Sequence, residues 1–358
     1  MQSVVTSPAS GYNVSMTWDL VGHDWAANLL ARHIQTGNIK HAYLFCGPDG
    51  IGRRSLALRF AQALTCQQAR SSGDPCLTCA SCQRIERMQH PDLFIVAAPE
   101  PGREIRIEQI RNLQHDLSLA PYEAPVRIGL LLDFQNANAN AQNAMLKTLE
   151  EPTTRVILLV TASRAEDLLP TIASRCEIIL LRPASVEVIA KELEKRQGVE
   201  KARAERIAHL SGGCYGYADT LHKNPADMEK ITALINGMLH MLSAPLRERF
   251  AYAEELTAKK PSAREILYQV IKIWLSLWRD TLIMASGGKA AIINSDFVET
   301  IRSLSAQVPM AEINSQMARL EDGLDKLDKN VNIRLLAEIL IMDLPQLRQP
   351  VHPPVLST

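Results

Sequence analysis

A glycine-rich segment lies between two stretches whose patterns predict a buried strand and an amphipathic helix. The segment is GPDGIGRR, residues Gly47–Arg54. It follows the apolar run HAYLFC (His41–Cys46) and precedes Ser55–Leu64, in which apolar residues recur on one helical face. Glycines at such a junction let backbone N–H groups approach a phosphate, and the start of the following helix favours an anion. The junction therefore predicts a phosphate-binding loop, although a Gly-rich turn without a ligand has the same pattern.

The first half of the chain alternates strand-like and helix-like segments, which predicts an α/β fold with a parallel sheet covered by helices. The predicted strands are His41–Cys46, Phe94–Ala97, Arg127–Leu132, Val156–Val160 and Glu177–Leu181, and the helices between them include Arg106–Leu119 and Ala139–Leu149. Past Pro183 the strand signal ends. Helical periodicity continues through Val186–Arg196, Lys201–Leu210 and about four longer helices to Leu344.

Length and composition favour two or three domains, because 358 residues with 46% apolar side chains can bury several cores. We expect loosely ordered ends and three domains between them. The expected boundaries are 1–16 for the N-terminal segment, 17–182 for the α/β domain, 183–242 for a small helical domain, 243–346 for a helical bundle and 347–358 for a Pro-rich tail.

The charge balance excludes the simplest argument for nucleic-acid binding, since 39 basic and 39 acidic residues cancel. The N-terminus lacks a cationic start followed by an apolar core, as a secretory signal would have. The apolar stretch Ile266–Ile283 contains charged residues and predicts a buried helix rather than a membrane span. We therefore expect a cytoplasmic protein with no membrane partner, whose seven cysteines are thiols or metal ligands.

The phosphate loop lacks the side chains that ATP hydrolysis needs. A working loop has Lys on the β- and γ-phosphates and Ser or Thr on magnesium, and these positions are Arg53 and Arg54 here. A planar guanidinium does not replace a compact ammonium. The third predicted strand leads to Asp133, the expected magnesium ligand, but Phe134 follows where a hydrolysing enzyme has Glu. We predict a degenerate nucleotide site that binds ATP weakly or not at all, formed by Gly47, Gly50, Gly52, Arg53, Arg54 and Asp133.

Four cysteines lie close together in the sequence just after the predicted phosphate-loop helix. Cys66 ends that helix, and Cys76, Cys79 and Cys82 follow as C-x2-C-x2-C. Four thiolates close a tetrahedral zinc site and leave no position open for chemistry. The pattern predicts a structural Zn²⁺ site, and the alternative is a group of packed free thiols.

The tripeptide Ser174-Arg175-Cys176 ends a short helix that begins near Pro170, just before the last predicted strand. An arginine at this corner can project away from its own loop toward the γ-phosphate of a neighbouring subunit, as an arginine finger in trans. The alternative is a surface arginine that caps a helix C-terminus.

Several motifs occur in the order found in bacterial clamp-loader AAA+ subunits, and the chain resembles that family. They are HAYLFCGPDGIG, the four-cysteine insertion, NAMLKTLEEP (Asn143–Pro152), LLVTAS (Leu158–Ser163) and SRC (Ser174–Cys176). In addition, NVNIRLLAEILIMDL (Asn330–Leu344) is similar to the last helix of the family's collar domain. The resemblance spans residues 17–346. It implies an AAA+ P-loop domain followed by a small helical lid domain and an all-α collar domain that joins subunits.

Two branches of this family carry the four-cysteine module, the ATP-hydrolysing motor called gamma/tau and a branch with a defective nucleotide site. The motor has an arginine in its lid helix, whereas Leu210–Leu221 (LSGGCYGYADTL) has none, and the chain lacks the long C-terminal extension of tau. With the altered loop and Phe134, the chain is more similar to the defective branch.

That similarity implies a structural and allosteric subunit of DNA polymerase III with no polymerase or ATPase activity of its own. It implies a heteropentamer with the gamma/tau and delta subunits, which meets the sliding clamp and primer-template DNA during DNA replication. In that assembly Arg175 would serve the ATP site of the adjacent motor.

The sequence is also compatible with two other functions. One is an AAA+ ATPase with an unusual loop, since the loop glycines and Asp133 are present. The other is a zinc-dependent DNA-binding adaptor, which the four cysteines suggest. The basic residues near the cysteines are few, and acidic residues accompany them: Arg70, Arg84 and Arg87 beside Asp74 and Glu86.

Overall fold

The computed structural model describes residues 18–68, 72–100, 103–151, 155–258, 263–327 and 331–347. The predicted N-terminal segment 1–16, the tail beyond Leu347, Arg70 and Pro152 lie outside these residues. The described chain divides into two compact units. Unit 1 comprises the residues up to Glu192 together with Gly213–Tyr217, and unit 2 comprises Leu193–Gly212 and the residues from Ala218 onward. The three-domain boundaries drawn from the sequence stay a prediction.

Unit 1 is built on a five-stranded parallel sheet in the order β2-β3-β4-β1-β5. The strands are β1 (Ala42–Cys46), β2 (Leu93–Val96), β3 (Arg127–Leu131), β4 (Val156–Ala162) and β5 (Glu177–Leu180). The parallel sheet predicted from the sequence is confirmed. The main difference is β4, which continues to Ala162, because Thr161 and Ala162 pair with Phe45 and Cys46 of β1.

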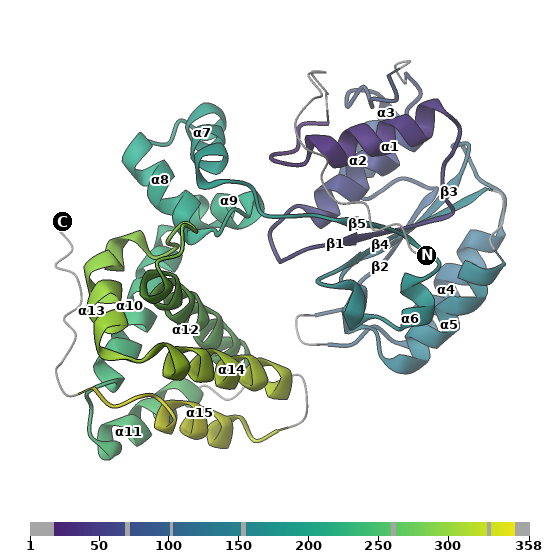
Figure 1. The fold of residues 1–358 in the computed structure, drawn as a ribbon. Coiled ribbons are helices and arrows are strands. Elements are labelled where there is room, and N and C mark those ends of the chain that lie inside the picture. Colours follow the sequence, from purple (N-terminus) through teal and green to yellow (C-terminus); the bar gives the residue numbers. More distant parts are fainter. Residues whose placement is uncertain are drawn as a thin grey trace. The chain divides into compact units, whose positions relative to one another are not determined.

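The two faces of the sheet each support a hydrophobic core, as expected for a parallel sheet buried on both sides. Tyr43 and Phe45 of β1 pack in one core, and Ala42, Leu44 and Cys46 pack in the other. Figure 1 shows α1, α2 and α3 over the first face and α4, α5 and α6 over the second. These helices are α1 (Asp24–Gln35), α2 (Arg53–Thr65), α3 (Ala80–Glu86), α4 (Ile107–Ser118), α5 (Ala139–Glu150) and α6 (Pro170–Ala173).

Because the strands are parallel, segments that follow a strand and segments that precede a strand lie at opposite edges of this sheet. Segments that follow β1, β3 and β4 lie at the carboxyl edge, whereas segments that precede β4 and β5 lie at the amino edge. The glycine-rich loop after β1 is therefore at the carboxyl edge, and Arg175 before β5 is at the amino edge. A strand of this length separates them by roughly 15 Å.

Unit 2 is helical, and α7 (Val186–Gln197) leads into it from unit 1. Its helices are α8 (Lys201–Leu210), α9 (Tyr215–Lys223), α10 (Pro225–Met241), α11 (Leu246–Thr257), α12 (Ala263–Ser286), α13 (Val298–Gln307), α14 (Met310–Leu327) and α15 (Ile333–Met342). Seven helices, α9 to α15, follow Leu210 among the described residues, where about four longer helices were predicted. Pro225, Pro245 and Pro309 stand at or next to helix starts, and proline cannot continue a preceding helix.

The apolar stretch predicted as a buried helix lies within α12. Trp274 and Trp278 are fully buried there, and the buried carboxylate of Asp280 accepts hydrogen bonds from the backbone and side chain of Asn294. None of the helices in the described part of the chain is long and apolar enough to cross a membrane.

Candidate functional site

The glycine-rich loop is filled by the side chain of its own arginine. Arg53 is the first residue of α2 and is only 7% exposed. Its Nη1 donates to Gly47 O at 2.6 Å and to Ser163 Oγ at 3.1 Å. Its Nη2 donates to Asp49 Oδ1 at 2.9 Å and to Asp133 Oδ1 at 2.8 Å. One guanidinium thus binds residues from the loop and from the ends of β3 and β4.

These contacts change what the loop can bind. The cation at the lysine position is paired with two carboxylates of the same chain, and Asp133, the predicted magnesium ligand, is one of them. A guanidinium in this pairing offers fewer donors to a phosphate, and a phosphate entering the loop would meet the two carboxylates. Both terminal nitrogens of Arg53 therefore have hydrogen-bond acceptors within the chain itself.

The segment Gly216–Tyr217 packs against the glycine-rich loop. The Gly216 N–H donates to Gly50 O at 2.9 Å. Gly50 has φ 73°, and a Cβ at this position would lie 2.8 Å from the backbone nitrogen of Tyr217. Only glycine therefore fits both the conformation and the close approach.

The neighbouring predicted residues are placed elsewhere. Arg54 points away from the Arg53 cluster, and its Nη2 contacts Met88 Sδ at 3.3 Å. Phe134 is fully buried at the start of a 3-10 turn (Phe134–Asn136), so it packs in the core and cannot orient water.

Three residues of this site were missed from the sequence. Asp49 and Ser163 bind Arg53, and the pattern of a glycine loop gives no signal for either contact. His23, just before α1, is 3% exposed and its Nε2 lies 2.7 Å from Ile51 O. Burial lowers the pKa of His23, so the ring is neutral and its Nε2–H donates to the loop.

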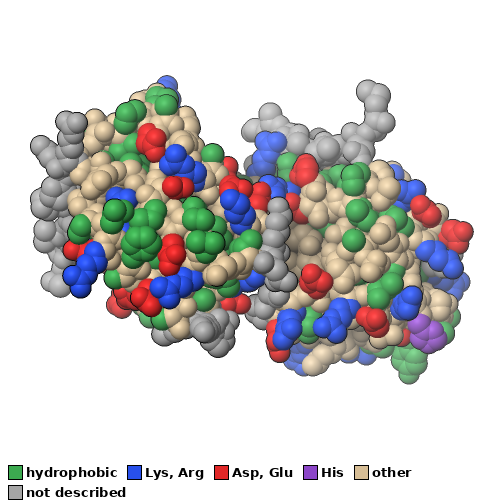
Figure 2. All heavy atoms as spheres, turned by 90° about the horizontal axis from the view of Figure 1, so that it is seen from below, with side chains coloured by type: hydrophobic (Ala, Val, Ile, Leu, Met, Phe, Trp, Pro, Cys, Tyr) green, Lys and Arg blue, Asp and Glu red, His purple; other side chains and the backbone are tan. Residues whose placement is uncertain are grey.

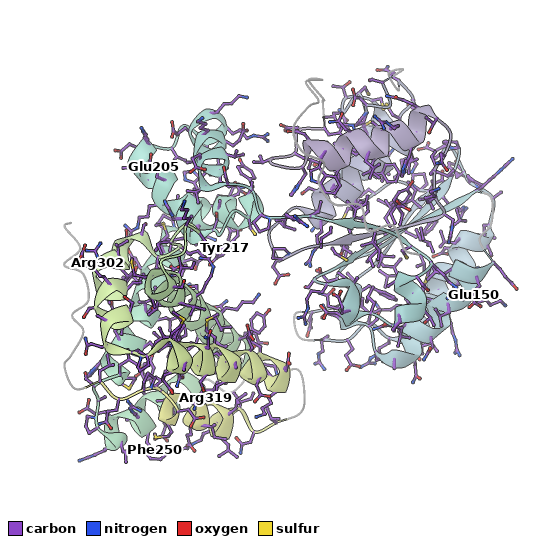
Figure 3. All side chains as sticks on the ribbon, in the orientation of Figure 1. Glu150, Glu205, Tyr217, Phe250, Arg302 and Arg319 are labelled. Atoms are coloured by element: carbon purple, nitrogen blue, oxygen red, sulfur yellow. The ribbon has the colours of Figure 1, made fainter. Side chains whose placement is uncertain are left out.

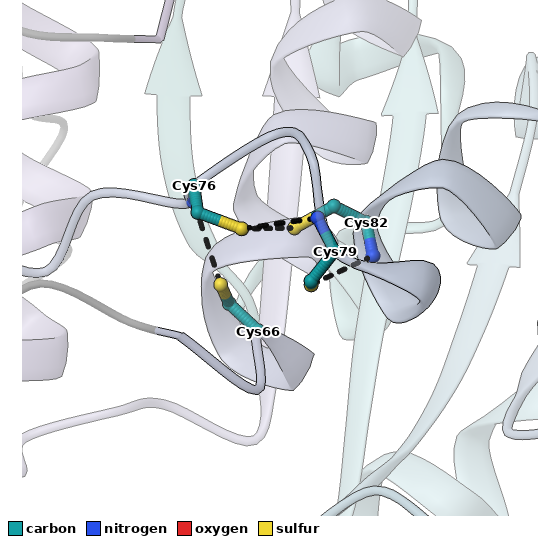
Figure 4. A group of neighbouring side chains, drawn as sticks. All are labelled: Cys66, Cys76, Cys79 and Cys82. Carbon is teal, nitrogen blue, oxygen red and sulfur yellow. Dashed lines mark hydrogen bonds between the residues drawn. The ribbon is translucent and has the colours of Figure 1, made fainter.

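The four predicted cysteines are brought together. The sulfur atoms of Cys66, Cys76, Cys79 and Cys82 lie within 4.8 Å of one another and point toward a common centre (Figure 4). Backbone N–H groups donate to three of them, from Cys76 to Cys66, from Cys79 to Cys76 and from Cys82 to Cys79. This cluster can hold a metal ion.

The environment of Cys76 favours the thiolate that a metal requires. Burial raises the pKa of its thiol, but hydrogen bonds from the backbone of Cys79 and Thr78 outweigh that effect and bring the pKa to about 6.

The cysteine module is fastened to the phosphate-loop helix. Gln62 of α2 donates to Cys82 O at 2.8 Å, and Ser81 Oγ of α3 donates to Thr65 O at 2.9 Å. Arg59 of α2 also pairs with Glu86 of α3. The module therefore braces the helix whose first residue is Arg53. The basic residues suggested for DNA binding are partly engaged, since Arg84 pairs with Glu123 at 2.6 Å.

Arg175 lies on the surface at the amino edge of the sheet. Its Nη1 donates to Thr171 O and its Nη2 to Glu150 Oε1, both at 2.8 Å. Ser174 is the exposed C-cap of α6, and Cys176 packs against the core, where burial raises the pKa of its thiol to about 12. Of the tripeptide, Ser174 is exposed, Arg175 is partly exposed, and Cys176 is partly buried against the core.

Comparisons with known proteins relate this chain to subunits of one polymerase. The profile of the family described as "DNA polymerase III, delta subunit" matches residues 22–185, and that of its C-terminal domain matches residues 238–346. DNA polymerase III subunit delta′ of Bacillus subtilis (strain 168) is 28% identical over 89% of this chain and 94% of its own length. The delta′ subunit of Pseudomonas aeruginosa is 38% identical over 58% of this chain and 65% of its own length.

The chain is also similar to other subunits of that polymerase. Subunit tau of Bacillus subtilis is 25% identical over 92% of this chain, but the match covers 61% of tau. Among solved structures, a gamma subunit-related protein from Thermotoga maritima covers 88% of this chain and 96% of its own length, with 17% identity and a TM-score of 0.38.

The fold and the matches define a DNA polymerase III clamp-loader subunit with an AAA+-type α/β domain and a C-terminal helical domain. Within that class, the chain belongs to the delta-prime family.

Proposed function

We propose that this chain is a structural and allosteric subunit of the clamp loader, and that it supplies Arg175 to the ATP site of a neighbouring gamma/tau subunit. The contrast between two arginines supports this function. Arg53 is buried and both of its terminal nitrogens are bound within its own loop site, whereas the side chain of Arg175 is 35% exposed at the opposite edge of the sheet. Because Arg175 cannot reach its own loop, a phosphate that it contacts belongs to another chain.

The second part of the proposal is that the chain binds ATP weakly or not at all. Asp49 and Asp133 neutralise Arg53, and Arg54 contacts Met88 instead of facing the loop. The site lacks a hydroxyl for magnesium at position 54 and a carboxylate at position 134.

The metal in the cysteine cluster is proposed to be a structural Zn²⁺. Tetrahedral zinc with Zn–S bonds of about 2.3 Å places sulfur atoms about 3.8 Å apart. The separation of 4.0 Å between Cys76 Sγ and Cys82 Sγ is close to this value. The ion would fix the loop between α2 and α3 and would take no part in chemistry, because four thiolates leave no open position.

An apolar face on unit 2 is proposed to meet the helical domain of a neighbouring subunit, as in a collar. Leu246 and Phe250 on α11 and Leu335 and Ile339 on α15 recur at i,i+4 spacing and are 47% to 65% exposed. An ion pair between Arg334 and Glu254 joins the two helices beside these positions.

Helices α11 and α15 lie lowest in unit 2 in Figure 1, and Phe250 projects from this side in Figure 3. Figure 2, seen from below, shows apolar side chains gathered on this side of unit 2. Exposed apolar groups in one place mark an interaction surface. The family's C-terminal domain profile matches residues 238–346, which include both helices, and a helical domain of another clamp-loader subunit is the proposed partner.

The arginine finger is tested by Arg175→Ala in a loader reconstituted with gamma/tau and delta. Loss of a finger lowers hydrolysis at the affected site by roughly 10³-fold or more. Clamp-stimulated ATP hydrolysis at that interface should fall accordingly, and Arg164→Ala, which removes another exposed arginine of unit 1, should leave it intact. Unchanged hydrolysis in Arg175→Ala would falsify the role of this residue.

Nucleotide binding is tested on the isolated chain with labelled ATP. We expect no saturable binding up to about 1 mM. Arg53→Lys combined with Arg54→Thr should gain binding, because an ammonium and a hydroxyl replace the paired guanidinium. Arg54→Thr alone should not, since Arg53 keeps its carboxylate partners. Micromolar binding by the unaltered chain would favour the ATPase alternative.

Metal analysis of the purified chain should find about one zinc per chain. Removal of the ion with a chelator should lower the midpoint of thermal unfolding by more than about 5 °C, because the brace on α2 is lost. Cys79→Ser should reduce the zinc content, and Cys214→Ser, outside the cluster, should not. A metal-free chain with unchanged stability would exclude the site.

The apolar face is tested by Phe250→Glu combined with Leu335→Glu. These exposed positions tolerate charge in the isolated chain, so its unfolding midpoint should be unchanged. Incorporation into the loader, measured by size-exclusion chromatography, should be lost because the face can no longer be buried. Met310→Glu on α14 is the matched control and should assemble normally. Normal assembly of the double variant would mean that this face is not the contact.

A further inference from the structure

The guanidinium of Arg175 is bound along one side by its own unit. Nη1 donates to Thr171 O in α6, and Nη2 donates to Glu150 Oε1, each at 2.8 Å. Glu150 is the last residue of α5 and is labelled there in Figure 3. The arginine therefore joins the ends of two helices at the amino edge of the sheet.

The backbone that carries Arg175 is fixed by other contacts. The Leu169 N–H donates to the buried side chain of Gln142 in α5 at 2.9 Å. Ile172 and Ala173 are buried, and Cys176 packs against the same core. Because these contacts hold the main chain, the torsions of the arginine side chain alone decide where its guanidinium lies.

The carboxylate leaves part of the guanidinium available. Glu150 accepts from Nη2 only, and Thr171 O accepts from Nη1, so the pair is not the two-pronged arrangement that occupies a whole edge of the fork. Among the described residues, Thr171 and Glu150 are the polar partners of Arg175. The arginine side chain is 35% exposed and that of Glu150 is 50% exposed, so an anion from outside can reach the remaining N–H groups.

We infer that Glu150 is a positioning residue for Arg175, an inference that rests on the arginine-finger role proposed above. The carboxylate holds the guanidinium in one rotamer before the neighbouring subunit arrives. The γ-phosphate of a nucleoside triphosphate bound by that subunit then meets donors that are already oriented. An arginine loses considerable rotamer freedom when it binds, and an arginine fixed in advance loses less at the moment of contact.

The inference is tested in the reconstituted loader with Glu150→Ala, Glu150→Gln and the neighbouring Glu151→Ala as matched control. Glu150→Ala should lower kcat for ATP hydrolysis about two- to fivefold, as expected for loss of a half-exposed ion pair, with little change in the KM for ATP. Glu150→Gln should recover most of the rate, because the amide oxygen still accepts from Nη2. Glu151 is exposed, and Glu151→Ala should behave like the unaltered chain.

A double variant separates positioning from a purely structural role. In the Arg175→Ala background, Glu150→Ala should cause no further loss, since its effect passes through the arginine. A further loss there, or an unchanged or faster rate in Glu150→Ala alone, overturns the positioning role while leaving the finger intact. If Arg175→Ala itself has no effect, the proposed finger fails instead. Size-exclusion and thermal unfolding of each variant confirm equal assembly and folding.

Discussion

Parallel pairing of β1 with both β4 and β5 is the constraint on which the rest of unit 1 depends. Leu44 is in register with Val160 on one side and with Ile178 on the other. Together with the parallel pairing of β3 with β4, this pairing brings the segments after β1, β3 and β4 to one edge of the sheet. The loop, Asp133 and Ser163 meet there although they are far apart in sequence. The same geometry places Arg175 and Glu150 at the amino edge. One sheet therefore carries the buried Arg53 at one edge and the partly exposed Arg175 at the other.

The cysteine module adds a local support to this long-range arrangement. Its four cysteines lie within a short stretch of chain, so the cluster forms from contacts near in sequence. The contacts of Gln62 and Ser81 connect it to the C-terminal half of α2, while Arg53 fastens the other end of that helix. Helix α2 is therefore held at both ends by polar contacts, in addition to the packing of Leu56 and Phe60 beneath it.

The sequence predicted the parallel sheet, the helices around it and the cysteine cluster, because each has a local signal. Apolar runs mark β1 and β3, and the C-x2-C-x2-C spacing marks the cysteines. The contacts of Arg53 with Asp49 and Asp133 had no such signal, since they depend on where strands end in space. The arginine at the lysine position predicted a defective nucleotide site. It did not predict that Arg53 would be paired within its own loop. The helix count after Leu210 was too low because apolar periodicity alone does not mark the helix boundaries at Pro245 and Pro309.

The pairing of Arg53 also has an evolutionary consequence. The Arg53 guanidinium binds Gly47 and Ser163 at the same time as it pairs with Asp49 and Asp133. A single substitution of Arg53 by lysine would lose several of these contacts. The gain would be small, because positions 54 and 134 would still lack a hydroxyl and a carboxylate. Under the proposed function, a single substitution at position 53 would therefore cost stability before it added any activity. The internal contacts of Arg53 would then oppose a stepwise change from a structural subunit to an ATPase.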